Sequence, residues 1–205
     1  MLIVVNVFIF IYEVSLGPDG MEYLFYMFGI VPANYSGAAL APIGYIPFVT
    51  SMFLHGGWMH LIGNMWILWL FGDNVEDRMG HVKFLIFYLI CGILAGLSHF
   101  YINAYSDIPV VGASGAVAGV MGAYFLVFRH AKVLTFIPPF FLLNLPAWIY
   151  LGFWAGSQLW SGAVDTFAGN SGEQIAFWAH VGGFAAGMLL VFIFMTPSQE
   201  YSELE

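Results

Sequence analysis

Two polar side chains in an otherwise apolar chain, Ser114 and His180, could together carry out nucleophilic catalysis. A serine hydroxyl is a weak nucleophile until a neighbouring base takes its proton, and histidine is suited to that role. Ser114 lies in the motif Gly112-Ala113-Ser114-Gly115, whose small residues leave its hydroxyl open to close approach. No carboxylate occupies a matching helical position beside His180. The residues therefore predict a Ser–His dyad, with Ser114 as nucleophile and His180 as base.

A second polar pair, His60 and Asn64, could stabilise the negatively charged oxygen of a tetrahedral intermediate. The two residues are one helical turn apart, so a helix would place both on one face. Both side chains can donate hydrogen bonds to the oxyanion, and the Ser114 backbone amide could join them. One such donor contributes typically about 100- to 1,000-fold in rate. The predicted oxyanion site therefore consists of His60, Asn64 and Ser114.

The composition places these residues in a membrane protein. Of the 205 residues, 61% are hydrophobic and 8% are charged, whereas soluble proteins carry about 25% charged residues. A bilayer accepts apolar side chains all around a helix, provided that the backbone polar groups bond internally. The net charge is −8 without a basic patch, and Cys91 is the only cysteine. We therefore expect membrane lipids as surroundings, and neither a nucleic-acid partner nor a cofactor or metal ion.

Stretches without Asp, Glu, Lys or Arg indicate where helices cross the bilayer. A first apolar run opens the chain, and the others are Ser51–Gly72, Phe84–Ser106, Ile108–Phe128, Val133–Val164 and Gln174–Gln199. Because a span needs about 20 residues, we predict an all-α protein with about six transmembrane helices. We expect one domain over residues 1–205, with an acidic tail from about residue 197.

Two connections between the predicted helices need separate treatment. Residues 16–50 are too apolar for a solvated loop, so we expect them to form a long first loop in the membrane interface. The stretch Val133–Val164 is too long for one helix and is interrupted by prolines. Its helix is predicted to begin near Pro146, after an apolar loop.

The positions of the basic residues predict the orientation. All four lie in two short connections, residues 78–83 and 129–132, and the positive-inside rule assigns both connections to the cytoplasm. Both termini should then be cytoplasmic, in a membrane that we expect to be a prokaryotic plasma membrane. Counting from the cytoplasmic ends places Ser114, His180 and Asn64 at one level, roughly 21 to 24 Å above that side. The site should therefore open through a cavity to the outer side.

Glycines indicate which predicted helices touch. Gly115 and Gly119 lie on one face of the fourth span, and Gly183 and Gly187 form a small-xxx-small face on the sixth. Close packing of these two faces would bring the nucleophile and the base together.

In these residues the chain resembles the rhomboid family of intramembrane serine proteases. The matching motifs are His60-x-x-x-Asn64, Gly112-x-Ser114-Gly115, and Ala179-His180-x-x-Gly183-x-x-x-Gly187. Glu76-Asp77-Arg78 also resembles an acidic-x-Arg element of the family, which we interpret as a structural charge pair of Glu76 and Arg78. The resemblance implies six helices, a membrane-associated first loop, a mobile fifth helix or cap near 165–173 that gates access, and transmembrane protein substrates.

The chain departs from the family pattern beside the predicted base. Some bacterial members carry a tyrosine four residues after the nucleophile, packed against the catalytic histidine, and this chain has Ala118 there. The alternative function is a catalytically silent rhomboid-like binder of transmembrane segments, which would be expected to lack the serine or the histidine. The His-Glu-x-x-His pattern of zinc proteases does not occur. We therefore predict an intramembrane serine endopeptidase.

Overall fold

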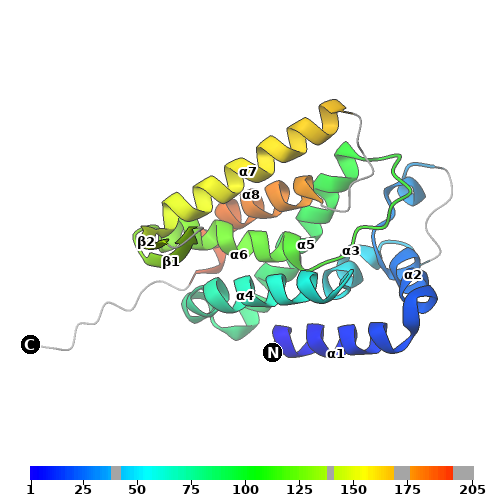
Figure 1. Ribbon diagram of the computed structural model, residues 1–205, viewed down its shortest axis with the longest axis horizontal. Helices are drawn as coiled ribbons and strands as arrows, with labels where there is room; N and C mark the ends of the chain where they lie inside the picture. Colours follow the sequence, from blue (N-terminus) through cyan, green and yellow to red (C-terminus); the bar gives the residue numbers. More distant parts are fainter. Residues whose placement is uncertain (38–42, 138–140, 169–175, 196–205) are drawn as a thin grey trace, which may run out of the picture.

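The computed structural model describes residues 1–37, 43–137, 141–168 and 176–195, and the chain is mostly helical (Figure 1). Its elements in chain order are α1 (Leu2–Ser15), α2 (Gly17–Phe28), the 3-10 helix η1 (Pro32–Tyr35), α3 (Pro47–Thr50), the 3-10 helix η2 (Ser51–Phe53), α4 (Trp58–Met79), α5 (His81–Ile102), α6 (Ser114–Val127), β1 (Lys132–Ile137), β2 (Phe141–Pro146), α7 (Ala147–Ala168) and α8 (Phe177–Phe194).

Helix α6 forms the core of the helical bundle. It packs against α4, α5, α7 and α8, and every residue from Gly115 to Tyr124 is buried. A helix that is apolar on all sides is expected at such a central position. Since α6 begins at Ser114, the surrounding helices bring their side chains to the residue predicted as the nucleophile.

The two predicted glycine faces lie against each other, with α6 and α8 in close backbone contact. A Cβ atom added to Gly183 would collide with the carbonyl oxygen of Gly115. One added to Gly187 would collide with the backbone of Gly119. Small residues permit this close approach between helices. The approach brings the N-terminal part of α8, which carries His180, beside the N-terminus of α6.

The described helices include two, α5 and α8, that are long and apolar enough to span a bilayer. Helices α1 and α6 are apolar but shorter, with 14 residues each. Helices α4 and α7 have 22 residues each. All six overlap the apolar stretches of the sequence, and the count of six transmembrane spans stays a prediction.

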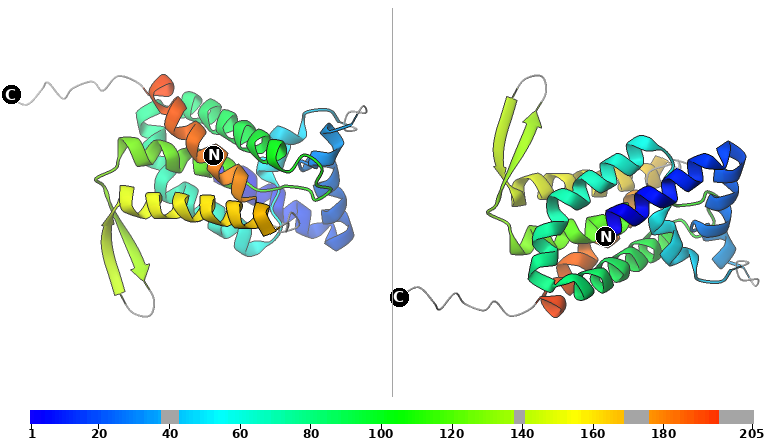
Figure 2. Two further views of the ribbon diagram at one scale, coloured as in Figure 1. Left: turned by 90° about the horizontal axis from the view of Figure 1, so that it is seen from above. Right: turned by 90° about the horizontal axis from the view of Figure 1, so that it is seen from below.

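Between α6 and α7, where the sequence predicts an apolar loop in an all-α protein, the structure instead has an antiparallel hairpin. Strands β1 and β2 pair from Lys132 with Pro146 to Ile137 with Phe141. The sequence of β1, KVLTFI, is rich in β-branched and aromatic side chains that favour strands. In a segment with few charges, the pairing satisfies backbone groups that an apolar loop would leave unbonded. The hairpin projects from one side of the bundle (Figure 2), and α7 begins at Ala147, as the proline pattern predicts.

The segment between α1 and α4 contains short helices. Helix α2 lies across the end of the bundle opposite the hairpin (Figures 1 and 2). After α2, Ile30 forms a β-bridge with Val110, which ties this segment to the connection that leads into α6. The location of residues 16–50 in the membrane interface stays a prediction. Residues 38–42, the acidic tail from about 197, and residues 169–173 of the predicted cap lie outside the described residues.

Candidate active site

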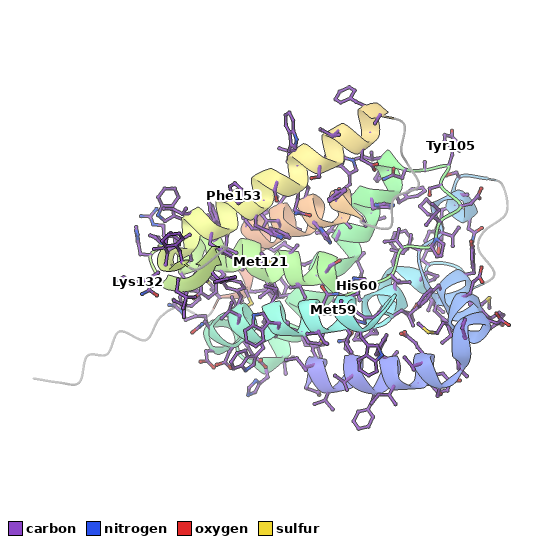
Figure 3. The ribbon with its side chains drawn as sticks, in the orientation of Figure 1. Met59, His60, Tyr105, Met121, Lys132 and Phe153 are labelled. Carbon is purple, nitrogen blue, oxygen red and sulfur yellow. The ribbon has the colours of Figure 1, made fainter. Side chains whose placement is uncertain are left out.

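The four polar residues singled out from the sequence all line one cavity. The cavity has a volume of about 750 Å³, and its walls include Ser114, His180, His60 and Asn64. These side chains come from α6, α8 and α4, which are far apart in the sequence. Figure 3 shows His60 toward the end of the bundle where α2 lies and Lys132 at the opposite end. The cavity thus lies away from the basic connection that follows α6.

Ser114 is the first residue of α6. The backbone N–H groups of a first helical turn have no partner within the helix, and together with the helix dipole they favour negative charge. Gly112, two residues before Ser114, has a φ of +128°, a backbone conformation that favours glycine. A Cβ atom at Gly112 would lie 2.7 Å from Nε2 of His60 and 3.7 Å from Oγ of Ser114. Glycine at position 112 therefore leaves room for the His60 ring, which any side chain there would meet.

The hydrogen bonds of His60 indicate which of its ring nitrogens carries the proton. The backbone N–H of Gly56 donates a long hydrogen bond, 3.4 Å, to Nδ1 of His60. In a neutral ring, an accepting Nδ1 leaves the proton on Nε2. That nitrogen faces Gly112, next to Ser114. His60 can therefore present an N–H donor toward the place where an oxyanion would form.

Asn64 lies one helical turn beyond His60 and also faces the cavity. Its side chain is 8% exposed, and its Nδ2 atom has no hydrogen-bond partner among the described residues. Buried donors are nearly always paired, so an unpaired one requires an explanation. An oxyanion in the cavity would provide the missing acceptor. The amide is therefore suited to act as a second donor beside His60.

His180 lies in the first turn of α8 and contacts two side chains of α7 that the sequence analysis did not select. Its Nδ1 atom is 2.7 Å from Oε1 of Gln158, and its ring centroid is 5.9 Å from that of Trp154. In the described part of the chain, Ser114 makes no hydrogen bond to His180; such contacts are often long before a substrate binds. One signal for Gln158 existed, since it is an uncharged polar residue within a long apolar stretch.

Three further polar residues were also missed as site residues, and two of them, Glu13 and His55, join α1 to the turn before α4. Asn6, Glu13 and His55 are each fully buried. The backbone N–H of His55 donates to Oε2 of Glu13 at 3.2 Å, and the His55 ring lies edge-on to that of His60 with centroids 5.2 Å apart. Helix α1 thus holds the turn that leads to His60. The signal for Glu13 was an acidic residue at the end of the first apolar run.

Glu76 contacts His81 instead of Arg78, its predicted partner in a charge pair. Oε1 of Glu76 lies 2.7 Å from Nδ1 of His81, and among the described residues Glu76 forms no ion pair with Arg78. Residues two positions apart on a helix do not face each other. Helix α4 ends at Met79 and α5 begins at His81, so the turn between them brings His81 back to Glu76.

Comparison with known proteins adds to this geometry. A family model described as the rhomboid domain matches residues 43–197. Rhomboid protein 1, mitochondrial, of Saccharomyces cerevisiae is 31% identical over 148 residues, which cover 70% of this chain and 40% of the relative. Rhomboid protease GlpG of Yersinia pseudotuberculosis is 30% identical over 146 residues, covering 70% and 46%. Rhomboid-like protein 11, chloroplastic, of Arabidopsis thaliana is 30% identical over 150 residues, covering 71% and 51%. The chain spans about half the length of these curated relatives.

Proposed function

The chain belongs to the rhomboid family of integral membrane proteins, and from this premise we propose that it is an intramembrane serine endopeptidase. Its proposed substrates are the transmembrane segments of other membrane proteins. The observation that carries the proposal is that one cavity is lined by a serine, a histidine and two potential oxyanion donors. The similarity to a relative that is named as a protease supports the same function.

The proposed reaction proceeds through an acyl-enzyme. Oγ of Ser114 attacks the carbonyl carbon of the substrate peptide bond while Nε2 of His180 takes the proton from the serine hydroxyl. The oxyanion accepts hydrogen bonds from His60, Asn64 and the Ser114 backbone amide. His180 then protonates the leaving amine, and the C–N bond breaks. In the second half, His180 takes a proton from water, the hydroxide attacks the ester carbonyl, and the proton returns to Ser114 as the acid product leaves.

The orientation that we propose for the protein in the membrane rests on the positions of its basic residues. Ser114 begins α6 and Arg129 lies just beyond its end, and the 14 residues of the helix correspond to about 21 Å. If the basic connections face the cytoplasm, the cavity lies nearer the outer side. We propose a prokaryotic plasma membrane with both termini in the cytoplasm.

The test of this function is cleavage of a reporter with one transmembrane segment by the purified protein in liposomes, together with labelling by a fluorophosphonate probe. We expect two fragments from the reporter and a phosphonylated peptide that contains Ser114. A catalytically silent binder, the alternative function, would hold the reporter without cutting it and would not be labelled. Binding without cleavage or labelling would therefore overturn the proposed activity.

Replacing Asn64 with alanine should lower kcat for the reporter by about 100-fold, because one oxyanion donor is lost while His60 and the backbone amide remain. KM should change little, since the donor acts mainly in the transition state. The measurement is initial cleavage rate against reporter concentration in liposomes.

Asn74→Ala is the matched control, because Asn74 lies on the same helix, α4, and is exposed. This variant should keep the wild-type kcat. If Asn64→Ala also keeps it, Asn64 is not an oxyanion donor. If Asn64→Ala lowers the thermal midpoint, the side chain of Asn64 instead stabilises the position of α4.

A further inference from the structure

We infer that Gln158 is a positioning residue for His180, which holds the ring in the tautomer needed to deprotonate Ser114. The inference deepens the proposed function and rests on it for the role of His180. Gln158 would supply the group that orients this histidine. The orienting groups come from α7, a different helix from the one that carries the nucleophile.

Three hydrogen bonds in sequence determine which way the Gln158 amide points. The Ser157 hydroxyl donates to the backbone carbonyl of Trp154 at 2.6 Å, so its oxygen remains free to accept. Nε2 of Gln158 donates to that oxygen at 3.2 Å. The amide oxygen of Gln158 is therefore the atom that faces His180, at 2.7 Å from Nδ1. Because an amide oxygen only accepts, Nδ1 of His180 must be the donor.

A proton on Nδ1 decides what the other ring nitrogen can do. In the neutral imidazole, Nε2 then carries the lone pair, which is the form that can take a proton from a serine hydroxyl. His180 and Ser114 line the same cavity. When the base becomes an imidazolium, the partial negative charge on the Gln158 oxygen also stabilises it. A neutral amide thus fills the place that a carboxylate occupies in a Ser-His-Asp triad.

Trp154 restrains the same ring from a second direction. It lies one helical turn before Gln158 on α7, and its ring is tilted by 36° against that of His180. Its centroid is 6.0 Å from that of Phe184, one turn beyond His180 on α8. Ala118 on α6 is fully buried, and its side chain is only a methyl group. The packing surface for the histidine is therefore supplied by Trp154.

The kinetic test compares two substitutions at one position. Gln158→Leu keeps a similar size but removes the acceptor, and we expect kcat to fall by about 10- to 100-fold with KM within about twofold. Gln158→Glu restores an oxygen at the same distance, and kcat should return to within about fivefold of wild type. Trp160→Leu, on the exposed face of α7, is the control and should keep wild-type kinetics. A Leu variant with wild-type kcat, or a Glu variant as slow as the Leu variant, would overturn the inference.

A spectroscopic test separates this inference from the proposed protease activity. In protein labelled with ¹⁵N-histidine and held at a pH where histidine is neutral, the His180 signals should show the proton on Nδ1; His180→Gln identifies them by their loss. Gln158→Leu should abolish this preference, and Gln158→Glu should retain it. An unchanged tautomer in the Leu variant would refute the role of Gln158 whether or not the protein cuts the reporter. If Ser114→Ala still cuts the reporter while the tautomer responds to Gln158, the proposed mechanism fails and the positioning contact stands.

Discussion

Replacing Ser114 with alanine is expected to reduce cleavage of the transmembrane reporter by about 10⁴-fold or more. The substitution removes the atom that forms the acyl-enzyme and leaves only binding and the oxyanion donors. Because Ser114 lies at the start of α6 with its hydroxyl toward the cavity, alanine should fit without disturbing the helix. The thermal midpoint should therefore stay at the wild-type value while fluorophosphonate labelling disappears.

A double variant tests whether Ser114 and His180 act as one unit. His180→Ala alone should lower the cleavage rate about as much as Ser114→Ala does. The double variant should be no slower than either single variant, because the effects of residues in one catalytic unit are strongly non-additive. Residual rates are measured in liposomes at saturating reporter. Losses that multiply in the double variant would mean that the two residues contribute independently, and continued cleavage by Ser114→Ala would exclude this serine as the nucleophile.

The second large effect is expected from adding one methyl group at Gly187. The new Cβ would meet the carbonyl oxygen, carbonyl carbon and Cα of Gly119, all of them backbone atoms that cannot rotate away. The overpacking should cost about 1–3 kcal/mol, or roughly 3 to 10 °C in the thermal midpoint. The forced separation of α6 from α8 should also displace the base from the nucleophile, and a displacement of about 1 Å can cost roughly 100-fold in rate.

Gly156→Ala is the matched control for Gly187→Ala. Gly156 lies on α7, and a Cβ added there would meet nothing within 4 Å. Alanine favours a helix over glycine by up to about 1 kcal/mol, so this variant should be as stable as wild type or slightly more stable. The thermal midpoints of both variants are measured by differential scanning calorimetry in the same detergent. Equal midpoints for the two alanine variants would show that the α6–α8 contact is looser than the structure has it.

Much of the site could be predicted because its signals are local. In an apolar chain, polar side chains within the helices stand out, since each costs free energy unless it has a role. The helical period places His60 and Asn64 on one face, and spacings of four residues align the glycines of α6 and α8. These inferences require only the helix, whose geometry is set by the backbone. They led to four of the residues that line the cavity.

The contacts that were missed join different elements. Glu76 pairs with His81 across the turn between α4 and α5, and the expected partner Arg78 lies on another face of the same helix. The hairpin between α6 and α7 depends on pairing between two segments, whereas the sequence pattern marks only the prolines that interrupt a helix there. Glu13 bonds to the turn 42 residues later. The residues next to Glu13 do not indicate that it contacts His55, and the residues next to His55 do not indicate Glu13.

By itself, the sequence determined the helical membrane class, the positions of the long helices and the polar residues that they carry toward a common site. Only the tertiary structure decided that His180 meets Gln158 and Trp154 of α7. The physical reason is that helical period is a property of one segment, while the rotation and register of two helices depend on packing over the whole bundle. The group that orients the predicted base is therefore visible only once α7 and α8 are packed together.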